Sequence, residues 1–178
     1  GELSTEEAFD LIDQMAECGV QNVDITGGEP FVRKDFWQLV DRILSHKMVI
    51  NQVYTNGWLL DDSILDKFES RGLKPEFSIS FDGVGWHDWM RGVPGAEEAT
   101  LRAFNRCKKR GFYATASVCI HRGNVSSLPQ TIEALRTVGV REAKTSNVDM
   151  TDLWRCHSEG NAMTQQEYMD AMIPYITW

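Results

Sequence analysis

The sequence predicts an α/β protein in which parallel strands form a partial, TIM-like barrel with helices outside it. Helical and extended segments alternate strictly along the chain, one of each per unit, which favours a parallel sheet with right-handed crossovers. Several extended segments are apolar on both faces, as strands of a parallel sheet are. Five such strands in 178 residues are too few for a closed barrel, which needs about 250 residues. A doubly wound sheet is the alternative, and the pattern alone does not separate the two.

The first unit begins with a helix. Ser4 and Glu7 form a capping-box sequence, apolar residues then recur at helical spacing, and Gly19 supplies a left-handed stop. A strand over residues 20–26 follows. Because the helix precedes this strand and the chain begins with Gly1, we expect that a first barrel strand is missing and that the chain is a fragment.

The later units repeat the pattern, with a glycine after most helices. Helices are predicted at 35–46, from Asp61 or Asp62 to Gly72, around 99–107 before Gly111, around 128–135 before Gly139, and from about Thr164; strands are predicted at 49–55, 75–81, 112–120 and 140–146. A loop at 84–95 and an irregular stretch at 147–162 separate them. We find no linker or low-complexity tract, so residues 1–178 are expected to form a single domain.

Composition restricts the partners of the chain. The net charge is −8 and the isoelectric point is near 5.0, whereas nucleic-acid-binding proteins usually carry a basic face, so no nucleic acid is expected. No apolar run approaches the roughly 20 residues that span a bilayer, and no signal peptide is visible. We therefore expect a cytoplasmic protein that does not bind membranes.

Cysteine spacing predicts no metal ligands within the chain. The cysteines are Cys18, Cys107, Cys119 and Cys156, and no two of them have the short spacing of a metal site. Buried, inert thiols are expected for the first three. Cys156 lies beside His157, but two neighbouring residues are a weak signal for coordination.

Polar residues and glycines collect where the strands end. The first four ends are Thr26-Gly27-Gly28-Glu29-Pro30, Thr55-Asn56-Gly57, Ser80-Phe81-Asp82-Gly83 and His121-Arg122-Gly123-Asn124, and the fifth is Lys144-Thr145-Ser146-Asn147. In parallel α/β folds, ligands bind at the carboxyl ends of the strands. Two glycines let the backbone approach a ligand closely, and Glu29 then offers a carboxylate to an amine. Hydroxyls and amides suit a ribose and an arginine suits a carboxylate, so a nucleoside-bearing ligand is predicted.

Three of these motifs, in this order, resemble the radical S-adenosylmethionine (SAM) superfamily. They are Thr-Gly-Gly-Glu-Pro at 26–30, Thr-Asn-Gly at 55–57, and Ile-Ser-Phe-Asp-Gly at 79–83 followed by His-Asp and Arg-Gly at 87–92. The resemblance runs from about Leu3 to Asn147. It is strongest to the branch that contains sulfatase-maturase-like and peptide-modifying enzymes. The ordered set is much more specific than any single motif.

The resemblance implies a cofactor site at the strand ends. It assigns the methionyl amine to Gly27, Gly28 and Glu29, the carboxylate or ribose to Ser80, and the carboxylate alternatively to Arg91. Thr55 and Asn56 line the same cavity, and Ser117 and Cys119 face the ribose or adenine. Thr26, Pro30 and Asp82 of the same motifs are further cofactor-binding candidates. No catalytic residue is assigned.

The resemblance also implies the family's chemistry. A reduced [4Fe-4S] cluster donates an electron to the sulfonium, and a 5′-deoxyadenosyl radical abstracts hydrogen from a substrate. The sequence does not identify this substrate, and a peptide or protein is one candidate. Flavodoxin or ferredoxin is the implied electron donor.

The sequence departs from the family in its cysteines. The family holds its cluster with a Cys-x3-Cys-x2-Cys loop after its first strand, and this sequence contains no such motif. Two explanations are open: the cysteines lie upstream of a truncated chain, or the protein is a degenerate member without a cluster. The start at Gly1 favours truncation. In either case the chain alone is predicted to be inactive. The Cys-rich C-terminal extension of the peptide-modifying branch is absent as well.

Two other functions stay open on the residues alone. One is a catalytically inactive barrel that binds a nucleotide-like ligand or a protein partner. The other is an unrelated partial-barrel enzyme with Glu29 and Asp82 as general acid and base, which is weakest because the first three strand-end motifs contain no histidine. Arg91 is equally compatible with stacking on a tryptophan. His87 and Asp88 are interpreted as helix-capping residues.

Overall fold

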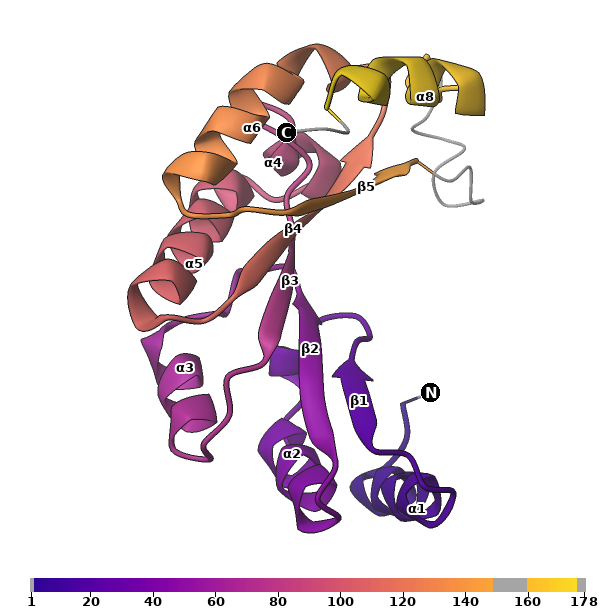
Figure 1. Ribbon diagram of the computed structural model, residues 1–178, viewed down its shortest axis with the longest axis vertical. Coiled ribbons are helices and arrows are strands. Elements are labelled where there is room, and N and C mark those ends of the chain that lie inside the picture. Colours follow the sequence, from indigo (N-terminus) through magenta and orange to yellow (C-terminus); the bar gives the residue numbers. More distant parts are fainter. Residues whose placement is uncertain (1, 149–159, 176–178) are drawn as a thin grey trace.

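The computed structural model describes residues 2–148 and 160–175, so Cys156, His157 and most of the predicted irregular stretch lie outside the described residues. Five parallel strands form a half-barrel in the order β1-β2-β3-β4-β5 (Figure 1). They are β1 (Asn22–Ile25), β2 (Val49–Thr55), β3 (Glu76–Ser80), β4 (Ala114–Ile120) and β5 (Ala143–Asn147). A doubly wound sheet would reverse its strand order at a switch point. The strictly sequential order therefore confirms the partial-barrel prediction.

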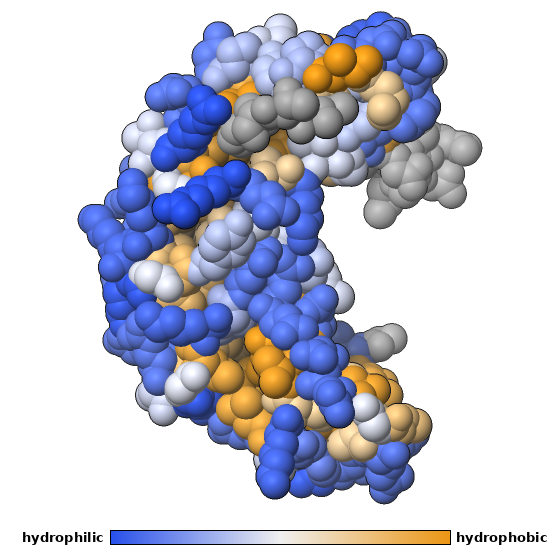
Figure 2. Space-filling view, in the orientation of Figure 1, coloured by the Kyte–Doolittle hydropathy of each residue, from blue (hydrophilic) through white to orange (hydrophobic). Residues whose placement is uncertain are grey.

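Helices cover the convex side of the sheet. They are α1 (Thr5–Glu17), α2 (Phe36–Ser45), α3 (Asp62–Glu69), α4 (His87–Arg91), α5 (Ala96–Arg110), α6 (Leu128–Thr137) and α8 (Gln165–Met172), with short 3-10 turns η1 (Pro30–Val32), η2 (Val125–Ser127) and η3 (Ile173–Tyr175). Figure 1 shows α2, α3, α5 and α6 along the convex side, and Figure 2 shows the opposite side hollowed. Helices α2, α3, α5 and α6 thus leave the concave face of the sheet uncovered.

Glycine ends four of the helices as predicted. In α1, the N–H of Gly19 donates to the carbonyl of Ala16, and the N–H of Val20 donates to Met15, both at 3.0 Å. This is the Schellman arrangement, which needs a left-handed residue; φ is +81° at Gly19. The same pair of bonds ends α3 at Gly72, α5 at Gly111 and α6 at Gly139.

Three strands begin later than predicted because of these helix ends. The sequence pattern predicts that β1, β4 and β5 start at residues 20, 112 and 140, but they begin at Asn22, Ala114 and Ala143. The apolar residue after each glycine has its N–H bonded back to the helix and cannot join the sheet there. Apolar character alone therefore assigns it to the wrong element.

The expected loop at 84–95 contains the short helix α4. Five residues are too few for a helix to be stable by itself, so its position depends on tertiary contacts. Asp88 of α4 also accepts the N–H groups of Gly95 and Glu97 at 2.6 and 2.7 Å, which caps the start of α5. The capping interpretation is confirmed for Asp88. His87 is instead the first residue of α4, and its ring is buried.

The core lies between the convex face of the sheet and the helices. Phe77 and Ile79 of β3 and Phe104 of α5 are fully or almost fully buried in it. Cys107 is also buried, and burial raises the pKa of its thiol to about 12, which confirms an inert thiol there. Cys18 is exposed, so the expectation of a buried thiol is wrong at that position, because it caps α1 at the surface. None of the helices in the described ranges is long and apolar enough to cross a membrane.

The carboxylate of Asp35 connects the N-terminal ends of α1 and α2, and its lowered pKa indicates that the stability of the fold decreases in acid. Asp35 accepts hydrogen bonds from Arg33 Nε at 2.7 Å and from Thr5 Oγ1 at 2.6 Å. These bonds, the one from Arg33 being the larger cause, lower the pKa of Asp35 to about 2. A lowered folded-state pKa gives stability that is present above the unfolded value of 3.8 and is lost as the pH falls toward about 2.

We expect Asp35→Asn to reduce the free energy of unfolding by about 1–2 kcal/mol near neutral pH. The difference from the wild type should become smaller as the pH falls toward 2, because Asp35 is progressively protonated there and loses its charge. Urea unfolding of both proteins at the two pH values measures this. An equal difference at both pH values would contradict it.

Candidate functional site

Glu29 bridges the ends of β1 and β2. Its two carboxylate oxygens accept hydrogen bonds from Thr55 Oγ1 at 2.9 and 3.0 Å, and Oε2 accepts the N–H of Asn56 at 2.7 Å. Phe31 donates its N–H to Oε1 at 3.3 Å. All these donors are uncharged, and the ion pairs of the described residues do not include Glu29. Within the described part of the chain, Glu29 is therefore a fixed anion whose charge no paired cation cancels.

The two glycines before Glu29 leave the backbone open. Thr26, Gly27 and Gly28 are exposed, while Pro30 is buried and starts η1. A Cβ atom added at either glycine would meet nothing within 4 Å. Gly27 has a φ of +149°, which a side chain would strain. The chain thus turns here with exposed peptide groups that a ligand can reach.

Gly57 holds the end of β2 against β3. Its φ is +78°, and an added Cβ would lie 2.8 Å from Ile79 Cγ2. The N–H of Gly57 donates to Thr55 Oγ1 at 3.1 Å, while the Thr55 hydroxyl donates to Glu29. The tight turn therefore orients the hydroxyl that holds the carboxylate.

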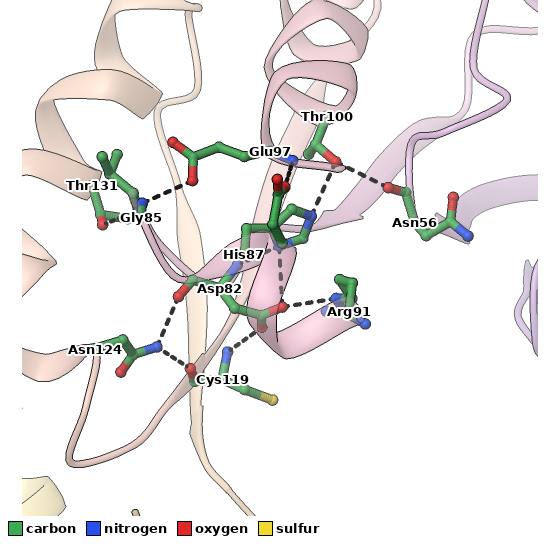
Figure 3. A network of polar contacts seen from close by, with 12 residues as sticks. Asn56, Asp82, Gly85, His87, Arg91, Glu97, Thr100, Cys119, Asn124 and Thr131 are labelled. Carbon is green, nitrogen blue, oxygen red and sulfur yellow. Dashed lines mark hydrogen bonds and ion pairs between the residues drawn. The ribbon is translucent and has the colours of Figure 1, made fainter. Parts of the chain in front are cut away.

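Asp82 is a fully buried carboxylate at the end of β3 (Figure 3). Oδ2 accepts Arg91 Nε at 2.7 Å, and Oδ1 accepts the N–H of Cys119 at 3.3 Å. His87 Nδ1 lies 3.1 Å from Oδ2. Burying a charge is costly unless it is paired, and Arg91 is the partner. Asp82 is thereby placed behind Arg91, away from solvent.

Asn124 joins the ends of β3 and β4. Its Nδ2 donates to the carbonyls of Asp82 at 2.8 Å and Cys119 at 2.7 Å (Figure 3). Its Oδ1 accepts the N–H of His121 at 2.8 Å. Thr131 of α6 accepts the N–H of Val84 at 3.0 Å. The loops after both strands are thus fixed by side-chain hydrogen bonds.

Ser80 and Ser117 lie side by side on the concave face. They are partners in the parallel register of β3 and β4. Their chain neighbours Ile79 and Ala116 are fully buried on the helix side, so the alternation of the strands turns both serines to the hollow. Beyond them, Cys119 Sγ lies 3.6 Å from Ser146 Oγ.

The tryptophans of the 84–95 segment pack on His121 rather than enclosing Arg91. The rings of Trp86 and Trp89 lie 5.2 and 5.5 Å from that of His121, and their own centroids are 5.6 Å apart. Burial lowers the pKa of His121. Arg91 has its contact with Asp82.

The structure thus brings the predicted residues together in two groups. Thr26 to Pro30 with Thr55 and Asn56 form the first, and Ser80, Asp82 and Arg91 with Ser117 form the second. Sequence reasoning missed Thr100, Asn124 and Thr131 as parts of the site. The two threonines sit at core-facing positions of amphipathic helices, and a hydroxyl on such a face is a signal for a buried polar contact.

Residues 2–148 and 160–175 contain no group of three or more His, Cys, Asp or Glu that could hold a metal ion. The described residues therefore offer no ligand set for an iron–sulfur cluster. They offer a fixed anion and a partly exposed arginine at the carboxyl edge of the sheet.

Comparison with known proteins identifies relatives. A family model described as the Radical SAM superfamily matches residues 1–135. The PqqA peptide cyclase of Granulibacter bethesdensis is 34% identical over 149 residues, which are 83% of this chain and 39% of that protein. The AdoMet-dependent heme synthase of Methanosarcina barkeri is 32% identical over 141 residues, 78% of this chain and 40% of that protein. The chain thus spans about two fifths of these relatives.

Solved structures show the same fold. The structure of anSMEcpe with bound AdoMet and Kp18Cys peptide covers 97% of this chain, which in turn covers 50% of that chain, with a TM-score of 0.76 and 15% identity. In that structure, anSMEcpe holds both AdoMet and the peptide.

The close packing around Gly57 predicts that a larger side chain at this position destabilises the protein. We expect Gly57→Ala to destabilise the protein by about 2–4 kcal/mol, because the methyl group meets Ile79 and the backbone φ is positive. Gly72→Ala is the matched control, with a φ of +69° and open space around it. It should cost only about 1 kcal/mol. Equal losses in urea unfolding would rule out the packing argument.

Proposed function

Because the chain belongs to the radical SAM superfamily, we propose that it forms the S-adenosylmethionine-binding core of a radical SAM enzyme that modifies a peptide or protein. Family membership confirms the resemblance in the strand-end motifs, and relatives include peptide-modifying enzymes. One observation carries the proposal for this chain: Glu29 and Arg91 present opposite charges on one edge of the sheet. The methionyl group of SAM carries an ammonium and a carboxylate that match these charges.

Glu29 is the proposed partner of the ammonium. Its hydrogen bonds come from Thr55, Asn56 and Phe31 and fix its orientation without neutralising it. A preorganised anion binds an ammonium with a charge-assisted hydrogen bond. The exposed peptide groups at Gly27 and Gly28 supply carbonyl acceptors for the remaining ammonium protons.

Arg91 is the proposed partner of the carboxylate. Asp82 binds only its Nε, and the Nη atoms donate to no acceptor among residues 2–148 and 160–175. The side chain is 34% exposed, so these donors are accessible. Guanidinium groups bind carboxylates in a planar, directional geometry. Ser80 adds a hydroxyl to the same ligand group, and Ser117 offers one to the ribose.

The radical chemistry needs a cluster that the described residues do not hold. A reduced [4Fe-4S] cluster, when bound, supplies the electron that cleaves the C5′–S bond of SAM and so generates the 5′-deoxyadenosyl radical. The described residues account for binding and orienting SAM. We propose the whole reaction, with a flavodoxin or ferredoxin as the reductant, for a protein that also holds the cluster. The peptide substrate is supported by the relatives that carry this activity in their names.

A second function is compatible with the described residues. An inactive barrel that binds SAM or a protein partner needs no cluster, and the described residues contain no group of ligands for one. Anaerobic reduction in the presence of SAM separates the two functions, because only the enzyme releases 5′-deoxyadenosine. Acid–base catalysis by Glu29 and Asp82 is not supported, because Asp82 is fully buried and paired with Arg91.

SAM binding measured by calorimetry tests the proposed site. We expect Glu29→Gln and Arg91→Gln each to weaken binding by about 10- to 100-fold, since each removes one charge-assisted contact. Glu98→Gln and Arg102→Gln are matched controls, because these residues form an exposed ion pair on α5, and they should leave the affinity unchanged. A wild-type protein that binds no SAM, or losses shared by the controls, would overturn the proposal.

A further inference from the structure

A continuous chain of hydrogen bonds connects Glu29 with Arg91. It runs from Glu29 through Asn56, Thr100, His87 and Asp82 to Arg91, and we call these four intermediate residues, all buried except Asn56, the buried link. The Asn56 N–H donates to Glu29 at 2.7 Å. The Asn56 carbonyl accepts the Thr100 hydroxyl at 3.1 Å (Figure 3). The same threonine oxygen lies 3.2 Å from His87 Nε2. A continuous series of hydrogen bonds therefore connects the two residues that are proposed to bind the charged groups of SAM.

The donors in the buried link can be assigned from its geometry. Thr100 has one hydroxyl proton, which it gives to the Asn56 carbonyl, so Thr100 accepts from His87 Nε2–H. His87 Nδ1 lies 3.0 Å from the peptide nitrogen of Asp82 and 3.1 Å from Oδ2 of the same residue. Both ring nitrogens are thus engaged, and the imidazole cannot rotate without breaking a buried contact.

Helix α4 explains why this link matters for Arg91. His87 and Arg91 are the first and last residues of α4 and stand four positions apart, so they lie on one face of it. His87 Nδ1 accepts the N–H of Asp82 at 3.0 Å, and Arg91 Nε donates to Oδ2 of the same residue at 2.7 Å. A helix of five residues has too few internal hydrogen bonds to fix its own position. His87 therefore sets where α4 lies, and α4 sets where Arg91 lies.

Thr100 supplies the fixed point. It belongs to α5, a helix of 15 residues that packs on the core, and its side chain is 1% exposed. It contacts both the turn after β2 and the ring of His87. Nothing in folding α5 requires a hydroxyl there, because valine has the same shape and suits a buried site. The hydroxyl serves the contact between the two strand ends.

We propose that His87 and Thr100 are positioning residues that hold Arg91 at a set separation from Glu29, and so select a ligand that carries both an ammonium and a carboxylate. This inference rests on the proposed SAM site, and it adds a role for residues that touch no ligand. It predicts an effect on the carboxylate contact alone, because Glu29 keeps its bonds to Thr55 and Phe31 when the link is broken.

The test compares two ligands, SAM and decarboxylated SAM, which keeps the ammonium and the sulfonium. The wild type should prefer SAM. Thr100→Val, which removes the hydroxyl but keeps the shape, should lose about tenfold of that preference, with the affinity for decarboxylated SAM retained. Thr100→Ser keeps the hydroxyl and should keep the preference. His87→Gln is the second variant, for use if Thr100→Val does not fold. It keeps a donor toward Thr100 but loses the group that faces Asp82, and it should show the same selective loss of preference for SAM.

The outcomes separate this inference from the proposed function. A wild type without any preference for SAM overturns the carboxylate site and the inference together. A wild type that prefers SAM, with Thr100→Val and His87→Gln showing the same preference, overturns the inference alone. Equal weakening for both ligands also overturns it, since a general loss of structure lowers both affinities.

Discussion

The burial of one carboxylate, Asp82, determines how the carboxyl edge of the sheet is built. A charge without access to water must be paired and hydrogen-bonded. Arg91 supplies the charge and the N–H of Cys119 supplies a further bond, so the requirement draws α4 and the end of β4 toward the end of β3. Asn124 closes the arrangement by binding the Asp82 carbonyl. The segments at this edge of the sheet are held together because the buried carboxylate of Asp82 must be paired.

The two faces of the half-barrel differ in character and in role. The convex face is apolar and packs on the helices, while the concave face carries polar side chains in its deeper part as well. Glu76 accepts bonds from the side chains of Gln52 and Thr115, and Lys144 Nζ lies 3.4 Å from Gln52 Oε1. The interior of a closed barrel is packed with layers of side chains. Here the polar contacts run across four strands and pair the polar side chains that face the hollow.

Local sequence signals predicted the elements and failed at their edges for identifiable reasons. Capping boxes and glycine stops depend on a few adjacent residues, so the helix ends at Gly19, Gly72, Gly111 and Gly139 were predictable. Lys47 ends α2 in the same left-handed conformation, with φ +61°, and no sequence rule singles out a lysine for this. Helix α4 was missed because its stability comes from Asp82 and not from its own five residues. Non-local partners decide such cases.

The site shows the same limit at the level of single residues. Motif reasoning selected both Asp82 and Arg91 as cofactor-binding candidates, because both belong to the motif that follows one strand. Burial separates them: the carboxylate is enclosed, and the guanidinium keeps its Nη donors for a ligand. Thr100 lies 44 positions from Asn56 in the sequence and yet fixes its carbonyl, so no local pattern could pair them. A sequence motif therefore contains both residues that contact the ligand and buried residues that hold those contacts in position. The two roles can be distinguished only where exposure and hydrogen bonding are known together.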